Sequence, residues 1–438
     1  MGRKVFHPGM KGWLLAAAAI TLVLLATFYF IFMMVPYYVI FIFVNFFFLF
    51  VEIVYLLKFR EEKEAERSSR FPSMTVLVPV YNSAKTLQKS LRAIKALKYP
   101  SRVEIIVIED ASSDGSYGIV RKEGGVDLIR TKENIGKAAS LNLGLRKAKG
   151  ELIATIDSDT YPEKDVLMKM VPHFTDEKVG AVVGLICANK PKNLLQRIQE
   201  VEYFVGFGFT QISYERMDGL FITPGPLSVY SRKALEQLGG FDEDNIAEDM
   251  EVALNLRRNG YEIVTTTDAV AFTETPNNLR SFYKQRIRWF RGAIYNGRKY
   301  FYMLFNRAYG NFGKFVFPVS YIIQAFSIVI MARLVSLYLE GMLAILAVLL
   351  NIAPASASLV ADVLAPHLLR LQSTVIFTIT TFLIWGYVVY TSFGIAGRKM
   401  NVRHLLPVFI FMSIYPFVLA LIYLISFIRE IAKSEAKW

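Results

Sequence analysis

Two carboxylates separated by one residue, Asp157 and Asp159, directly follow the apolar run Leu152–Ile156. At the end of a strand, side chains two positions apart can point to the same side. Carboxylate oxygens are the ligands that Mg²⁺ and Mn²⁺ prefer, and both ions usually keep coordination places for phosphate oxygens. The pattern therefore indicates a metal-bound phosphate. Two loop carboxylates that cap a helix starting near Pro162 are the alternative interpretation.

Two further charged groups stand at the start of helical patterns. Glu248 and Asp249 open the pattern Met250–Asn259. Carboxylates there either complement the helix dipole or act as a general base towards a hydroxyl group. Lys137 follows Asn134-Ile135-Gly136 at the start of another helix. It can bind phosphate by charge and helix dipole together, or it is a solvated surface lysine.

The segment Gln285–Trp289 lies on a predicted helix rich in basic residues. Arg288 could grip phosphate with its planar set of donors, and Trp289 offers a flat apolar face to a sugar ring. The alternative is a basic helix beside a membrane. The surrounding basic residues are Lys284, Arg286, Arg291 and Arg298.

Apolar strand-like runs alternate with helical patterns along this part of the chain, which predicts a parallel α/β sheet. Ligands of such sheets lie beyond the carboxyl ends of the strands. The polar clusters follow three strands at that edge: Tyr81-Asn82, Glu109-Asp110 and Asp157-Ser158-Asp159. The expected strands are Met74–Pro79, Val103–Ile108, Val126–Ile129, Leu152–Ile156 and Val179–Leu185.

The 438 residues are 54% hydrophobic with a formal charge of +13, and the lone Cys187 excludes an internal disulfide. A basic chain can bind nucleic acid, but the long apolar runs favour an anionic membrane surface and no nucleic acid. The expected membrane spans are Leu14–Val35, Pro36–Leu57, Phe315–Leu339, Ser373–Ala396 and Leu405–Ile428.

Basic residues flank these spans and set the expected topology. The positive-inside rule places both flanks of the first pair of spans, and the loop Arg398–Arg403, in the cytosol. We therefore expect two N-terminal transmembrane helices in residues 1–58, a cytosolic catalytic domain in 59–311 and about three transmembrane helices in 312–438. Residues 341–369 are apolar enough at their start for a further span or a re-entrant segment. The aromatic stretch Asn189–Met217 is expected to be a helix, either on the membrane surface or in the core.

Taken together, the motifs resemble those of the family 2 glycosyltransferases. The closest likeness is to the membrane-bound group with the hyaluronan, chitin, cellulose and poly-N-acetylglucosamine synthases. The segments that carry it are Pro79–Asn82, Glu109–Ser112, Asn134–Lys137, Asp157–Asp159, Gly225–Ser228, Ala247–Asp249 and Gln285–Trp289.

The resemblance implies a GT-A fold and inverting chemistry. Asp159, with Asp157, would hold Mn²⁺ or Mg²⁺, and Asp249 would be the general base with Glu248 beside it. The implied nucleotide-sugar-binding residues are Tyr81, Glu109, Asp110, Lys137, Asp157, Ser158, Gln285, Arg288 and Trp289. Two positions depart from the family pattern, because Glu109 stands where many relatives have Asp, and Ala247 where many have Thr.

The leading hypothesis is a synthase that adds sugars from a UDP-sugar, such as UDP-N-acetylglucosamine or UDP-glucose, to a β-linked glycan at the cytosolic membrane face. The second is a single addition to a lipid acceptor. A non-catalytic transporter or receptor is a third, but it predicts the loss of a catalytic carboxylate, and Asp159 and Asp249 are both present. The sugar, acceptor, linkage and oligomeric state are not fixed by the sequence.

Overall fold

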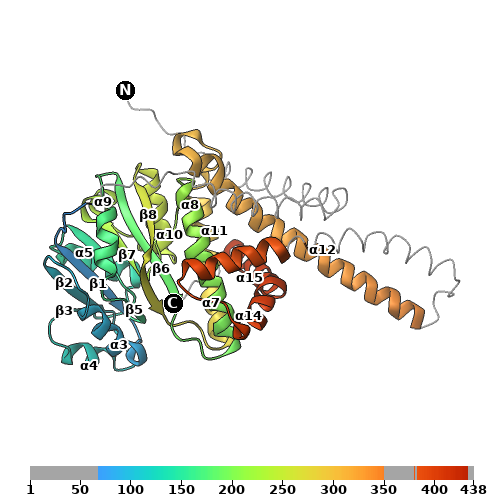
Figure 1. The fold of residues 1–438 in the computed structure, drawn as a ribbon, viewed down its shortest axis with the longest axis horizontal. Helices are drawn as coiled ribbons and strands as arrows, with labels where there is room; N and C mark the ends of the chain where they lie inside the picture. The colour runs from blue at the N-terminus through green and yellow to red at the C-terminus, as the bar shows by residue number, and fades with distance from the viewer. Residues whose placement is uncertain (1–67, 350–378, 380–381, 433–438) are drawn as a thin grey trace. The chain divides into compact units, whose positions relative to one another are not determined.

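The computed structural model describes residues 68–349, 379 and 382–432. Within them, one eight-stranded sheet has the order β3-β2-β1-β4-β7-β6-β8-β5 (Figure 1). The strands are β1 (Met74–Val80), β2 (Val103–Glu109), β3 (Asp127–Arg130), β4 (Leu152–Thr155), β5 (Thr160–Pro162), β6 (Val179–Ala188), β7 (Ser228–Ser231) and β8 (Glu262–Thr273).

The first half of the sheet is parallel, as the sequence predicts. β1 pairs in parallel with β2 and β4, and β2 with β3. All seven residues of β1 are buried because helices cover both faces of the sheet. Val76 and Val78 pack into the core that contains helix α3 (Ala84–Lys95), whereas Leu77 packs on the opposite face with helix α5 (Lys137–Lys147). Helix α4 (Ser116–Lys122) connects β2 and β3.

The second half corrects the expectation of a parallel sheet. β7 lies antiparallel between β4 and β6, and β5 is antiparallel to β8. These strands escaped prediction because β5 and β7 have three and four residues, and β8 is interrupted by threonines and an aspartate. The alternative of a helix starting near Pro162 is wrong, because Thr160–Pro162 is β5 and helix α6 (Val166–Met170) begins later.

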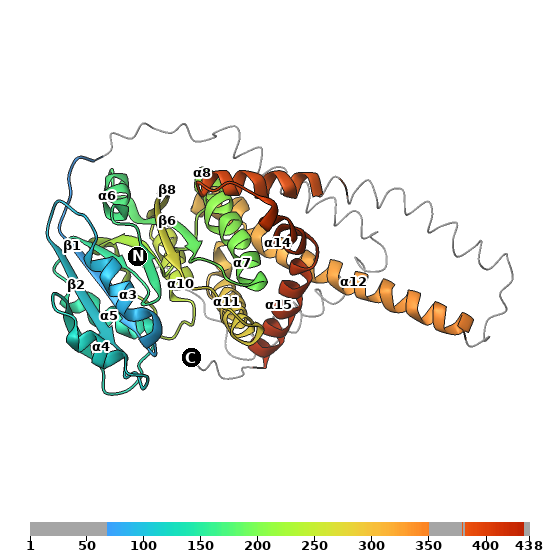
Figure 2. The same cartoon turned by 60° about the horizontal axis from the view of Figure 1, so that its bottom comes forward.

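Further helices lie between and after the strands in the sequence. They are α7 (Leu194–Tyr203), α8 (Gln211–Arg216), α9 (Arg232–Leu238), α10 (Glu248–Arg258), α11 (Leu279–Lys299), α14 (Val402–Ser413) and α15 (Tyr415–Ile431). The expected helix Asn189–Met217 starts at Leu194, after the cap Asn193, and has a π-helical middle at Phe204–Thr210. Helices α7 and α14 pack together, as do α11 and α15 (Figure 2).

One buried arginine connects three of these helices. Arg286 of α11 forms an ion pair with Glu202 of α7, and the Tyr415 hydroxyl of α15 donates to the same carboxylate at 2.7 Å. The Arg286 guanidinium also lies 4.0 Å from the ring centroid of Trp289. A buried arginine without its acidic partner is strongly unfavourable, so this contact fixes the position of α11.

Three of the expected membrane spans, Phe315–Leu339, Ser373–Ala396 and Leu405–Ile428, overlap apolar helices. Among the described residues, one helix is long and apolar enough to cross a membrane, in the window Phe312–Val329 at the start of α12 (Phe317–Leu349). The pair α14–α15, bent by 45°, would be a second, and Phe382–Ile395 is shorter. The expected spans Leu14–Val35 and Pro36–Leu57 lie outside the described residues, as does most of 341–369.

We expect Arg286→Met to destabilise the protein, by about 3 kcal/mol, because it leaves Glu202 without its cation and removes the stack on Trp289. The measurement is the melting temperature of the purified protein in detergent. Arg280→Met is the matched control, since Arg280 is exposed on the same helix. Equal melting temperatures for the two variants would contradict this role.

Candidate active site

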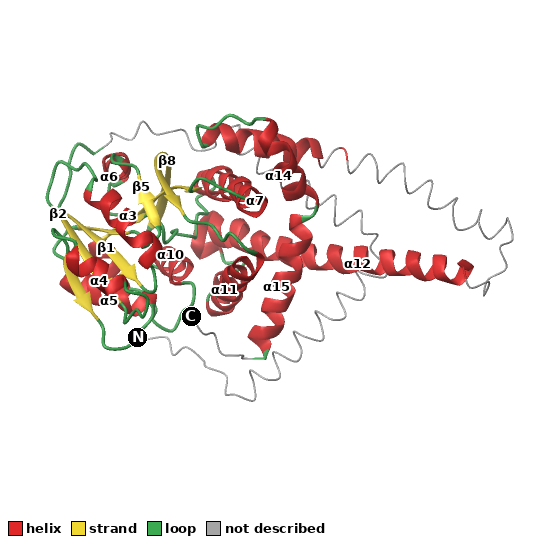
Figure 3. Ribbon diagram, turned by 90° about the horizontal axis from the view of Figure 1, so that it is seen from below, coloured by secondary structure: helices red, strands yellow, loops and turns green. Residues whose placement is uncertain are grey.

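A pocket of about 200 Å³ opens where the carboxyl ends of β1, β2 and β4 meet. The strands β1 and β2 and the helices α10 and α11 around it are labelled in Figure 3. Seven of the predicted site residues line it: Tyr81, Asp110, Lys137, Asp157, Ser158, Asp159 and Arg288. Tyr81 is partly exposed at its rim, where an aromatic ring can stack on a flat ligand.

Asp110 organises the loop that leads into α5. Its carboxylate accepts hydrogen bonds from the backbone N–H groups of Ile135 and Gly136, both at 2.9 Å, and from the Thr131 hydroxyl at 2.9 Å. Gly136 has a φ of 87°, which glycine adopts without strain. The acidic side chain therefore holds the turn that places Lys137 at the helix start. Its predicted contact with the nucleoside remains a prediction.

Lys137 lies between two carboxylates from distant parts of the chain. Its Nζ is 2.7 Å from Asp157 Oδ1 and 2.9 Å from Glu248 Oε1. Burial opposes its charge, but Asp157, Glu248 and Asp249 outweigh this effect and raise the pKa of Lys137 above its ordinary value. The lysine is therefore a permanent cation that joins the end of β4 to the start of α10.

Gly225 leaves room for this cation. A Cβ atom at Gly225 would collide with Lys137 Nζ and would lie 3.0 Å from Asp157 Oδ2. The same loop is attached to α10, because the Thr223 hydroxyl donates to the backbone oxygen of Asp249 at 2.7 Å. A side chain at position 225 would therefore have to displace Lys137 from this ion pair.

Asp159 is the second carboxylate of the acidic pair and is partly buried. Burial and the neighbouring Asp157 charge raise the pKa of Asp159 to about 6, partly offset by Lys137 and by the Thr273 hydroxyl, 3.3 Å away. A divalent cation beside this carboxylate would stabilise its charged form. Asp157 and Asp159 fit Mn²⁺ or Mg²⁺ as two hard oxygen ligands, with room for phosphate oxygens. Within the described ranges no group of three or more His, Cys, Asp or Glu side chains could hold a metal.

Glu248 and Asp249 occupy the first turn of α10 and have pKa values shifted in opposite directions. Burial opposes ionisation of Glu248, but Lys137 and Arg288 lower its pKa. Burial and the Glu248 charge raise the pKa of Asp249 to about 6, and Lys137 and Arg288 offset part of this rise. Glu248 is therefore ionised, and Asp249 is the carboxylate of the two that can exchange a proton near neutral pH.

Helix α11 supplies the remaining predicted residues. Arg288 reaches the pocket, while Trp289 packs partly buried against the core and against Arg286. Gln285 accepts a hydrogen bond from Arg286 at 2.6 Å and does not line the pocket. Arg286, which the sequence offered only as part of a basic surface, is the residue that positions its neighbours.

Two of the predicted site residues, Glu109 and Ser158, form polar contacts within the protein. Glu109 is buried below the pocket, where its carboxylate accepts the Ser112 N–H at 2.7 Å and lies 3.3 Å from Arg130. Ser158 lines the pocket and is bonded to the Ser83 hydroxyl at 2.7 Å.

The sequence identified Ala247 as a departure from the family pattern, but it did not predict the contacts around it. Asn245 and Asn296 are hydrogen bonded at 2.7 Å, and the Asn245 carboxamide oxygen accepts the Ala247 N–H at 3.0 Å. Ala247 packs directly on Gly292 of α11, where any Cβ would collide with it. Small residues at this crossing let α10 and α11 approach each other closely. In the sequence, the available signal for this contact was Gly292, about one turn after Gln285–Trp289.

The mixed sheet with a carboxylate pocket at its strand ends is a GT-A-like α/β nucleotide-sugar-binding domain. Residues 75–239 match the family described as "Glycosyl transferase family 2". The chain therefore carries a glycosyl transferase family 2 domain.

Two curated relatives show the extent of the likeness. The probable glycosyltransferase YdaM of Bacillus subtilis (strain 168) is 31% identical over 279 residues, or 61% of this chain and 66% of that protein. The poly-beta-1,6-N-acetyl-D-glucosamine synthase of Staphylococcus aureus (strain COL) is 31% identical over 224 residues, or 50% of this chain and 54% of that protein. The chain thus spans between half and two thirds of the length of these curated relatives.

A solved structure shares the fold over most of the chain. It is the mannosyltransferase PcManGT from Pyrobaculum calidifontis in complex with GDP-Man and Mn²⁺. The TM-score is 0.60 at 20% identity, with 91% of this chain and all of that chain covered. At this identity the likeness concerns the fold.

We expect Gly225→Ala to weaken UDP binding about tenfold, because the new methyl group displaces Lys137 from Asp157 and removes one charged contact. Isothermal titration of the purified protein with UDP and Mn²⁺ measures this. Gly118→Ala on α4 is the control, since its methyl group would meet no atom within 4 Å. Unchanged affinity in Gly225→Ala would show that the lysine position is irrelevant to the nucleotide.

Proposed function

We propose that the protein is an inverting glycosyltransferase that moves a sugar from a UDP-sugar, UDP-N-acetylglucosamine or UDP-glucose, to a growing β-linked glycan. The observation that carries the proposal is the pocket in which Lys137 joins Asp157, at the donor end, to Glu248, beside Asp249. The likeness to a poly-beta-1,6-N-acetyl-D-glucosamine synthase supports the substrate class. Tyr81, Asp110 and Ser158 would contact the nucleoside part, and Lys137 and Arg288 its diphosphate.

In this mechanism Asp249 removes the proton from an acceptor hydroxyl. The hydroxyl oxygen forms a bond to the anomeric carbon from the side opposite the diphosphate, whose bond to that carbon breaks. Asp249 suits this task because its pKa of about 6 keeps it ionised at neutral pH and still basic. Glu248 has a buried Oε2 that accepts no hydrogen bond from the described part of the chain, so it can receive a sugar hydroxyl.

The departing diphosphate carries negative charge that must be neutralised. Asp157 and Asp159 would hold Mn²⁺ or Mg²⁺, which supplies this charge when bound. Arg288 and Lys137 provide fixed positive charge at the same pocket. Gln285 and Trp289 would close over the acceptor side, with Trp289 held in orientation by Arg286.

We also propose that the enzyme is an integral, multi-pass membrane protein with residues 59–311 in the cytosol, between the spans of residues 1–58 and 312–438. The apolar helix at Phe312–Val329 and the bent pair α14–α15 support it by length and composition. Addition of one sugar to a lipid acceptor is the second candidate, and the product size separates the two.

A donor screen tests the proposed function. The purified full chain with Mn²⁺ and a membrane extract as acceptor should release UDP from at least one UDP-sugar. GDP-mannose is included because a protein of the same fold binds it. Asp249→Asn should retain donor binding and lower transfer about 10²- to 10⁴-fold, whereas Asp159→Asn should weaken metal-dependent binding itself.

Asp268→Asn, an exposed change on β8, is the control for this screen. No nucleotide release from any donor would refute the function. Equal loss of donor affinity in Asp249→Asn and Asp159→Asn would refute the assignment of roles.

The pH dependence of transfer should report the general base. Since Asp249 must be ionised and its pKa is raised to about 6, kcat/KM should rise about tenfold per unit below pH 6 and level off above it. Asp159 has a similarly raised pKa, so UDP affinity is measured over the same range to separate binding from proton transfer. A rate that is constant from pH 5 to 8 would contradict the assignment of Asp249.

A further inference from the structure

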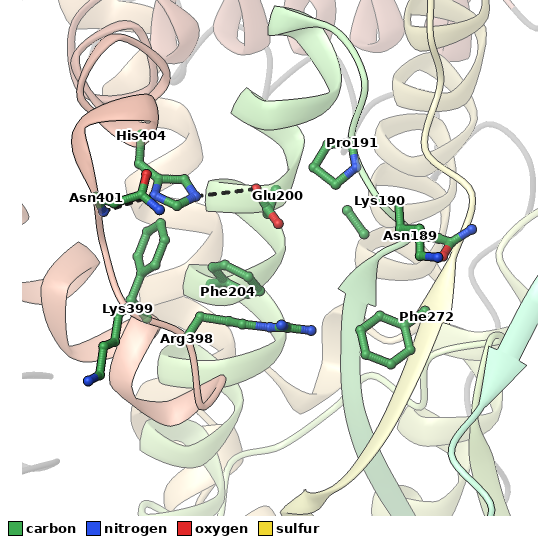
Figure 4. A pocket seen from close by; sticks show the side chains of 12 residues that line it. Asn189, Lys190, Pro191, Glu200, Phe204, Phe272, Arg398, Lys399, Asn401 and His404 are labelled. Carbon is green, nitrogen blue, oxygen red and sulfur yellow. Dashed lines mark hydrogen bonds and ion pairs between the residues drawn. The ribbon is translucent and has the colours of Figure 1, made fainter.

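A second cavity, of about 490 Å³, shares no lining residue with the carboxylate pocket. Figure 4 shows the side chains that line it. It is bordered by the end of β6, by α7 and by the loop between the apolar helix Phe382–Ile395 and α14. We call it the basic hollow and define it by Lys190, Glu200, Phe272, Arg398, Lys399 and His404. None of these residues has a part in the transfer mechanism above.

The charge of the basic hollow is predominantly positive. Lys190, Arg398 and Lys399 are exposed basic side chains, whereas Glu200 is the acidic residue on its lining. Glu200 points to His404, whose Nε2 is 3.9 Å from its carboxylate, and Arg398 extends across the hollow towards Phe272 (Figure 4). Lys190 has a φ of 43°, a conformation that residues other than glycine seldom adopt and that is concentrated at functional sites.

A second hollow of about 720 Å³ adjoins the basic one and shares Phe393, Arg398 and Lys399 with it. Its other walls come from the apolar helix and the turn after it, including Tyr390, Ile395 and Met400. Tyr390 is 65% exposed, and Val402 at the start of α14 is 82% exposed. Arg398 and Lys399 therefore lie near exposed apolar side chains.

We propose that the two hollows together bind a membrane lipid with a phosphate headgroup. The phosphate would lie in the basic hollow, between Arg398, Lys399 and Lys190, and a hydrocarbon chain would run along Phe382–Ile395. Arginine and lysine between apolar helices on the cytosolic side of a membrane are the groups that bind such headgroups. The N-terminus of α14, capped by Asn401 on the lining, adds positive potential.

The far wall of the basic hollow leads back to the metal-binding carboxylates. Asn189 donates to Glu274 at 2.6 Å, and the Glu274 N–H lies 3.4 Å from the backbone oxygen of Asp159. The inference rests on the proposed membrane location and is independent of the transfer reaction.

The test is equilibrium binding of a fluorescent phosphatidic acid to the purified full chain in a neutral detergent. Unlabelled phosphatidic acid should displace the probe, whereas diacylglycerol, with the same chains and no phosphate, should not. Inorganic phosphate alone should compete only weakly, because it lacks the hydrocarbon chain. Arg398→Gln and Lys399→Gln should each weaken binding about tenfold.

Arg403→Gln is the matched control, because Arg403 is an equally exposed arginine on the same segment but lines neither hollow. It should bind the probe like the unaltered chain, and melting temperatures of all variants establish that they are folded. Equal weakening by Arg403→Gln would show diffuse attraction and overturn the proposal. Full competition by diacylglycerol or by inorganic phosphate would overturn it too, in favour of an apolar groove or a soluble-anion site.

Discussion

The ion pairs of Lys137 with Asp157 and Glu248 hold the candidate active site together. Four carboxylates, at Asp157, Asp159, Glu248 and Asp249, occur near one pocket and would repel one another without a cation. One lysine offsets part of that repulsion, while Asp159 and Asp249 still keep a pKa of about 6. A divalent metal and a proton-donating hydroxyl can reduce the repulsion that remains between these carboxylates. Stability and chemistry therefore depend on the same contact.

The other constraint is the position of helix α11. Arg286 fixes it against α7 and α15, and the contact of Gly292 with Ala247 brings it close to the start of α10. Arg288 can then reach the pocket from the helix that also carries Trp289. The helix is thus held by the buried ion pair of Arg286 and by the contact of Gly292 with Ala247. The Ala at position 247 fits this crossing, where a larger residue would meet the backbone of α11.

Much of the catalytic half could be predicted because its signals are local. β1, β2 and β4 are apolar runs followed by polar residues, and parallel strands bring those ends together. The antiparallel strands β5 and β7 could not be predicted, because three or four residues carry no periodicity. The role of Arg286 depends on Glu202 and Tyr415, which are far away in sequence, and no single-sequence pattern joins them. The same holds for Glu109, whose contacts are with the turn after β2 and with β3.

The most direct test of the account is a double-mutant cycle of Lys137→Met and Glu248→Gln, measured as the dissociation constant of the donor sugar nucleotide with Mn²⁺. If the lysine links the two carboxylate groups into one site, each single change raises the dissociation constant. The dissociation constant of the double variant then does not exceed the larger of the two single-variant values. If the two effects multiply, the residues act independently, and the central claim that Lys137 unites the donor and acceptor ends of the site is wrong.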